Sequence, residues 1–186
     1  MRTILLVIFI VFLLFMAGCV RSLHPLYTDN DLVFERGLLG TWAEEKNSKD
    51  SWIFQKAGEN AYDLIHTEKG TSARFEAHLV RLGEFLFLDI FPEPPDTKNE
   101  FYKFHLIQAH TFSRIWIHGD VVRLSMLDND WLWDMISHNK VSIRHERVDH
   151  GVILTASTEE LQKFVVTYAN DTLAFPQPSE LSRIQQ

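Results

Sequence analysis

TSARFEAHLVRLGEFLFLDIF, residues 71–91, is the stretch that decides the fold. Gly83-Glu84 lies near its centre, and a glycine followed by a polar residue is typical of a two-residue turn between antiparallel strands. This turn sets the register and places His78 opposite Asp89. Because side chains alternate along a strand, Phe75, Ala77, Leu79, Leu86, Leu88 and Ile90 share one, mainly apolar face of the hairpin. The other face carries Glu76, His78 and Asp89 and then, toward the turn, Val80, Leu82, Phe85 and Phe87.

A hairpin with these two faces needs cover on both sides. We expect the interior of a barrel or sandwich to cover the apolar face, and a helix or the N-terminal leader to cover the mixed one. Short alternating runs separated by turn residues flank the hairpin, which is typical of a β-meander. The expected strands are residues 51–56, 61–67, 71–82, 85–91, 101–109, 114–118 and 121–126.

A second turn sets the register of the last two strands of this meander. Gly119-Asp120 suits a two-residue hairpin turn, which places His118 opposite Val121. It also places Trp116 opposite Arg123. We expect the guanidinium of Arg123 to cover the Trp116 ring, since a cation is attracted to the face of an aromatic side chain.

The C-terminal part predicts two helices. Asp128 can cap a short helix that ends near Ser137, and Ser157-Thr158-Glu159-Glu160 is a capping box. The apolar residues after this box recur at the spacing of a helix that lies on a sheet. They are Leu161, Phe164, Val165 and Tyr168. Two further short strands are expected at residues 140–144 and 152–155.

Composition restricts the class of protein. Lys and Arg total 18 and Asp and Glu total 25, a net charge of −7, so no basic patch suits nucleic acid. The many aromatic residues exclude a disordered chain. Cys19 is the sole cysteine, so no disulfide is available. We expect a mainly β protein with a tether at residues 19–36, a single domain at 37–175 and a loose tail at 176–186.

The N-terminal segment predicts export. Ile4–Ala17 is a run of fourteen apolar residues, which fits a signal-peptide core of about 7–15 residues. It is shorter than the roughly 17 residues that a membrane-spanning helix needs. Met16-Ala17-Gly18-Cys19 resembles the lipobox of bacterial lipoproteins, with Met in the position where Leu is usual. The resemblance implies that residues 1–18 are a signal peptide cleaved after Gly18, and that Cys19 carries the lipid.

The same resemblance implies a location in the cell envelope. The residue after the cysteine is Val20, not the Asp that commonly retains such proteins in the inner membrane. We therefore expect a lipid anchor in the outer membrane, facing the periplasm, in a bacterium with two membranes. In other bacteria the expected place is the outer face of the cytoplasmic membrane. An uncleaved signal anchor is the alternative.

Gly40-Thr41-Trp42 opens the meander, and an amphipathic helix follows its last strand. This pattern is similar to that of the lipocalins and the wider calycin group. The resemblance implies an eight-stranded barrel in which Trp42 plugs one end and a late arginine, Arg144 or Arg147, packs across it. Asp128-Asn129-Asp130 stands where that family has Thr-Asp-Tyr, and it departs from that motif.

Glu76, His78 and Asp89 are the candidate ligand-binding residues. If their face lies inside a barrel, they form a polar floor or a His–carboxylate pair that can move a proton. If it lies outside, they are surface charges. His145 and His150 are five residues apart, whereas metalloprotease helices space the two histidines by four. We therefore expect neither a metal nor a cofactor, and we assign no catalytic residue.

Three functions are compatible with this chain. The first is a lipid-anchored, non-enzymatic envelope protein that binds a small apolar or amphiphilic ligand. The second is an interaction module that docks an envelope protein complex through the apolar part of the mixed face. The residues of that part are Val80, Leu82, Phe85 and Phe87. The third is a hydrolase that uses His78 with Asp89.

Overall fold

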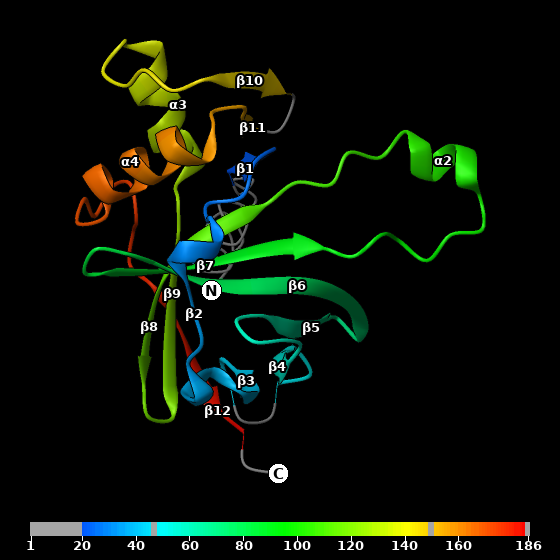
Figure 1. Cartoon of the computed structure of the whole chain (residues 1–186). Coiled ribbons are helices and arrows are strands. Elements are labelled where there is room, and N and C mark those ends of the chain that lie inside the picture. Colours follow the sequence, from blue (N-terminus) through cyan, green and yellow to red (C-terminus); the bar gives the residue numbers. More distant parts are fainter. Residues whose placement is uncertain (1–19, 46–47, 149–150, 185–186) are drawn as a thin grey trace, which may run out of the picture.

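A closed antiparallel barrel organises the chain. The computed structural model describes residues 20–45, 48–148 and 151–184. Within these ranges eight strands follow one another around the barrel in chain order, and the last pairs with the first (Figure 1). They are β3 (Gly40–Ala43), β4 (Ser51–Lys56), β5 (Tyr62–Glu68), β6 (Thr71–Leu82), β7 (Phe85–Pro92), β8 (Thr111–His118), β9 (Val121–Met126) and β12 (Ser179–Arg183). The predicted mainly β, antiparallel meander is confirmed, and of the barrel and the sandwich that it left open the structure has the barrel.

Both predicted hairpin registers are confirmed. In the β6–β7 pair His78 lies opposite Asp89, and the β8–β9 pair has the register expected from its own turn. Gly83 and Gly119 have φ angles of 61° and 58°. These left-handed values cost glycine little because it has no Cβ. The two turns therefore set the register of half the barrel.

An arginine covers the Trp116 ring as predicted, but it is Arg114 and not Arg123. The guanidinium carbon of Arg114 lies 4.5 Å from the ring centroid of Trp116. Arg123 instead faces β12, where its Nε donates to Glu180 Oε2 at 2.9 Å. Because the carboxylate lies directly opposite Arg123 in the β9–β12 register, it is the nearer and stronger partner.

The barrel wall separates two apolar cores. The inner core is filled by side chains of the barrel strands and of the segment before β3, among them Leu38, Trp42, Phe54, Tyr62, Leu79, Leu88, Ile115 and Leu181. An eight-stranded barrel is wide enough for its own side chains to fill it or for one small ligand, and here large side chains occupy it. The outer core lies against the opposite face of β6 and β7 and includes Leu26, Val80, Phe87, Leu132, Leu154, Leu161 and Val165.

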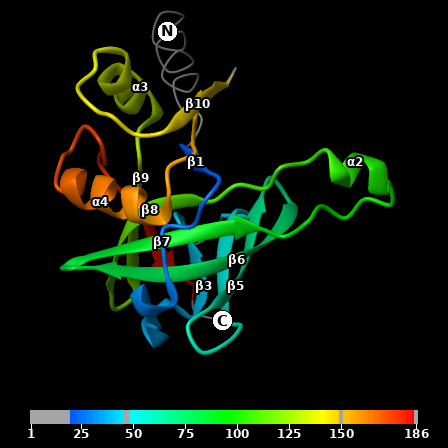
Figure 2. The ribbon, with the colours of Figure 1, turned by 45° about the horizontal axis from the view of Figure 1, so that its top comes forward.

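Helices and a small sheet cover the outer core (Figures 1 and 2). The helices are α3 (Asn129–Ser137) and α4 (Thr158–Tyr168), and the small sheet joins β1 (Arg21–Ser22), β11 (Gly151–Leu154) and β10 (His145–Val148). Both predicted caps form: the Asp128 carboxylate accepts from Trp131 N–H, and Ser157 forms a capping box with Glu160. The expected strand at 140–144 lies instead at β10, which is the segment that reaches β11.

The N-terminal leader, residues 20–36, packs on the barrel. Val20, Ser22 and Leu26 are buried. The leader continues through η2 (Asp29–Asp31), β2 (Leu32–Val33) and η3 (Arg36–Leu38), and β2 adds to the edge of β6. The expected tether is therefore part of the folded body from Val20 onward. The predicted cover of the mixed hairpin face is confirmed, since leader and helices both supply it.

Two other sequence expectations are wrong. Residues 93–109 leave the barrel as an arm that carries α2 (Glu100–Phe104), and they do not form the strand expected at 101–109 (Figure 1). β7 pairs directly with β8, which leaves no edge for another strand. The expected loose tail contains β12, which closes the barrel between β9 and β3. Leu181 is its single apolar residue, too weak a pattern to predict a strand.

Candidate functional site

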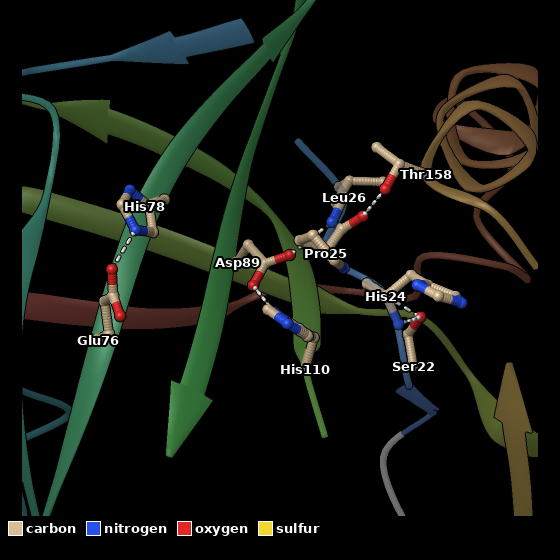
Figure 3. A network of polar contacts seen from close by, with 9 residues as sticks. All are labelled: Ser22, His24, Pro25, Leu26, Glu76, His78, Asp89, His110 and Thr158. Atoms are coloured by element: carbon tan, nitrogen blue, oxygen red, sulfur yellow. Dashed lines mark hydrogen bonds and ion pairs between the residues drawn. The ribbon is translucent and has the colours of Figure 1, made fainter. Parts of the chain in front are cut away.

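Glu76, His78 and Asp89 lie on the outer wall of the barrel, beneath the leader (Figure 3). None of the three faces the barrel interior. His78 and Asp89 are buried, whereas Glu76 is exposed. The structure thus places them on one face, as predicted, but covers that face with residues 22–27.

His78 and Asp89 do not bond to each other, although they are opposite in register. His78 Nε2 lies 2.8 Å from Glu76 Oε1, and its Nδ1 lies 3.0 Å from the backbone oxygen of Asn60. Figure 3 shows the His78 ring directed toward Glu76 and away from Asp89. His78 is thus held by Glu76 and Asn60, which leaves Asp89 to other partners.

Asp89 bonds instead to His110 and to the leader. Its Oδ1 lies 2.7 Å from His110 Nδ1, and its Oδ2 accepts from Leu26 N–H at 2.8 Å (Figure 3). The backbones of His110 and Ser22 also exchange two hydrogen bonds, at 2.9 and 2.8 Å. Asp89, His110 and Leu26, here called the Asp89 cluster, therefore join the leader to the barrel wall. Sequence reasoning missed His110 because it lies at the far end of the arm.

Aromatic rings enclose this cluster. The Tyr27 ring centroid lies 4.5 Å from that of His78, and the Phe91 centroid lies 4.4 Å from that of His110. Burial raises the pKa of Tyr27 to about 12, and the charges of Asp89 and Glu76 add to the shift. Both oxygens of Asp89 are engaged, so the arrangement suits a structural contact more than proton transfer to a substrate.

The raised pKa of Tyr27 predicts a loss of stability in alkali. The folded state disfavours the phenolate, so the contribution of Tyr27 is complete below its ordinary pKa of 10 and declines as the pH rises toward 12. The unfolding free energy should therefore fall more steeply above pH 10 in the parent chain than in Tyr27→Phe. Urea denaturation of both at a series of pH values measures this, and parallel curves would contradict it.

The apolar part of the mixed face is unavailable to a partner. Val80, Leu82 and Phe87 are buried in the outer core, and Phe85 lies under the guanidinium of Arg114 at 4.9 Å. The docking surface predicted from these residues is therefore wrong, because leader and helices occupy it. The hydrolase hypothesis likewise lacks the His78–Asp89 contact that motivated it.

At the end of the barrel where β3 begins, Trp42 is fully buried in the inner core. Arg183 of β12 packs across it, with the guanidinium carbon 4.1 Å from the ring centroid. Its side chain also donates to the backbone oxygens of Leu39 and Gly37 at 2.6 and 2.7 Å. The late arginine is thus Arg183. Arg144, expected there, pairs with Glu160 at 2.6 Å.

Arg147, the other expected arginine, also lies elsewhere. Its guanidinium carbon is 4.2 Å from the ring centroid of Trp133 in α3. The reason is shared by both arginines. Residues 129–168 form the layer outside the barrel, so a side chain from this part of the chain does not reach the end where Trp42 lies.

The opposite end of the barrel opens into an apolar pocket of about 630 Å³, here called the mouth pocket. It lies between the barrel, the base of the arm, β1 and β11. Its apolar lining includes Leu23, Phe75, Ile90, Leu106, Ile107 and Ile153. Charged and polar side chains from Arg21, Glu93, Gln108 and Glu146 also line it. Sequence analysis named none of these residues, since they come from four separate segments.

Comparison with protein-family models, with curated proteins and with solved structures finds no match. None of the helices within the described ranges is long and apolar enough to cross a membrane. Among residues 20–45, 48–148 and 151–184 no group of three His, Cys, Asp or Glu side chains is arranged to hold a metal ion. Gly18, Cys19 and His150 lie outside these ranges.

Proposed function

We propose that this protein is a lipid-anchored, non-enzymatic component of the bacterial cell envelope that binds a small apolar or amphiphilic ligand in the mouth pocket. The lipobox-like Met16-Ala17-Gly18-Cys19 supports a lipid on Cys19. The proposed location is the outer membrane, facing the periplasm, or the outer face of the cytoplasmic membrane where there is only one.

The mouth pocket is the observation that carries the ligand proposal. Its volume of about 630 Å³ falls within the range of roughly 300–1,000 Å³ typical of small-molecule sites. The barrel interior offers no comparable space, because Trp42, Phe54 and Tyr62 fill it. A ligand would thus lie at the open end, against Phe75 and Ile90, and not deep in the barrel.

The polar residues of the pocket favour an amphiphile over a pure hydrocarbon. Arg21 and Glu146 come from β1 and β10, whereas Leu106 and Ile107 come from the arm. The polar or charged end of an amphiphile can bind Arg21 or Glu146, while its apolar part packs against Leu106 and Ile107. Burying apolar surface contributes about 25 cal/mol per Å², so the apolar wall would supply most of the affinity.

Filling the pocket tests this proposal. Ala109 lines the mouth pocket, and Ala109→Trp should displace a bound amphiphile. The full chain, purified from its native membrane, should release in organic extraction one dominant lipid-like molecule, and the variant should release much less of it. Mass spectrometry of the extract measures both amounts.

A matched tryptophan serves as the control. Ala57 is exposed in the loop after β4, so Ala57→Trp adds the same side chain away from the pocket and should leave the extract unchanged. Equal extracts from the parent chain and both variants, or no co-purifying molecule in any of them, would overturn the ligand proposal.

A further inference from the structure

The arm ends in an exposed aromatic tip, residues 98–105. The side chains of Phe101 and Phe104 are 75% and 83% exposed, and Tyr102 is also exposed. Figures 1 and 2 both show α2 standing clear of the barrel. Exposed apolar side chains gathered in this way mark a site that contacts a membrane or another protein.

Cations accompany these aromatic residues. Lys98 and His105 are exposed, and Lys103 pairs with Glu100 at 3.0 Å. The chain as a whole is acidic, with a net charge of −7, so its tip differs from the rest of its surface. Aromatic rings together with lysines are the composition of segments that lie at a membrane–water interface.

The N-terminal end of the folded body indicates that the apolar surroundings of the tip are a membrane. Residues 4–17 are a continuous apolar run. In the proposed function a membrane lies immediately before Val20. A lipid on Cys19 holds the chain there after cleavage, and the run itself would hold it there if it were not cleaved. Val20 is already buried in the outer core. Arg21 pairs with Ile153 of β11. No residue therefore separates Cys19 from the folded body, so the body lies directly at the membrane that holds Cys19.

The arm leaves the body on this same side. Arg21 and Leu23 line the mouth pocket together with Leu106 and Ile107 at the arm's base. His110, the residue that follows the arm, exchanges backbone hydrogen bonds with Ser22. The base of the arm therefore lies beside the start of β1, which is the point where the chain reaches the proposed membrane.

We propose that the aromatic tip inserts into the leaflet that holds the N-terminal anchor. This inference rests on the proposed anchor but not on the ligand. Phe101, Tyr102 and Phe104 enter the interfacial region, and Lys98 and Lys103 contact anionic headgroups. The tip is also a second point of attachment that fixes the orientation of the mouth pocket toward the bilayer.

A probe at Phe104 tests the insertion. The lipidated full chain carrying Phe104→Cys is labelled with an environment-sensitive fluorophore and reconstituted into protein-free vesicles of phosphatidylethanolamine and phosphatidylglycerol. Phe104 is exposed, so the substitution removes no packing. We expect a several-fold rise in emission on reconstitution and strong quenching by brominated lipids. Adding Phe101→Ser and Tyr102→Ser should remove most of the rise.

Glu84→Cys is the matched control, because Glu84 is exposed at the turn at the other end of β7. Its label should report water in the same vesicles. If the chain floats with the vesicles but the labels at positions 104 and 84 behave alike, insertion is overturned while the anchor stands. A chain that does not float overturns the anchor and the insertion together. A signal at position 104 in native membranes but not in protein-free vesicles would assign the tip to a protein partner and overturn insertion.

Discussion

Cys19→Ser is expected to abolish attachment of lipid to this protein and to prevent its normal maturation. The thioether that a lipobox receives forms on sulfur, and Cys19 is the sole cysteine of the chain, so no other residue can accept it. Cells grown with an alkyne fatty acid should label the parent chain and leave the variant unlabelled. Mass spectrometry of the N-terminal peptide should find modified Cys19 as the first residue of the parent chain.

Met16→Leu is the control for this experiment. It introduces the residue usual at that position of the lipobox, so labelling and cleavage should be retained. A parent chain that still begins at Met1, with an unmodified Cys19 thiol, would contradict the lipid anchor. That result would favour the uncleaved signal anchor.

Asp89→Ala is expected to lower the unfolding free energy by several kcal/mol, because it leaves two buried hydrogen-bonding groups unpaired at about 1–3 kcal/mol each. The Asp89 side chain is 1% exposed, and its loss leaves His110 and the Leu26 N–H without their acceptor. Domains of this kind have a total stability of about 5–15 kcal/mol, so the loss is large. Urea denaturation followed by tryptophan fluorescence measures it.

Glu76→Ala supplies the comparison, because it removes a carboxylate that also bonds to a histidine but is 58% exposed. Exposed pairs contribute about 0–1 kcal/mol, so this variant should unfold close to the parent chain. Limited proteolysis should also cut the leader sooner in Asp89→Ala than in Glu76→Ala. Equal stabilities, with an uncut leader in both, would contradict the role of Asp89 in holding the leader.

The Asp89 cluster lies between the two parts of the chain that are proposed to contact the membrane, the N-terminal leader and the aromatic tip. The cluster joins residues 22–26 to the barrel wall, and the same leader begins one residue after the proposed lipid. With Cys19 lipidated as proposed, the orientation of the leader at the membrane would set that of the barrel through Asp89, His110 and Leu26. The arm follows directly from β7, the strand that carries Asp89.

Several features of the fold depend on residues that are close in the sequence, and these could be predicted. The register of β6 and β7 follows from Gly83-Glu84 and strand alternation, and the caps of α3 and α4 follow from Asp128 and Ser157. The β6–β7 hairpin carries apolar side chains on both faces, so the sequence predicts that other segments cover both of them. The N-terminal run predicts export by its length and composition alone.

Other features depend on where distant segments meet, and only the tertiary structure decided them. His110, not His78, bonds to Asp89 because the arm returns the chain to β8 beside the leader. Arg183, not Arg144 or Arg147, packs over Trp42 because the eighth barrel strand comes from the C-terminal end. The sequence by itself determined local geometry, since turns, caps and alternation act within a few residues. Which side chains bond across the wall, and where a pocket opens, depended on the closure of the barrel, because that closure brings together groups that no local pattern relates.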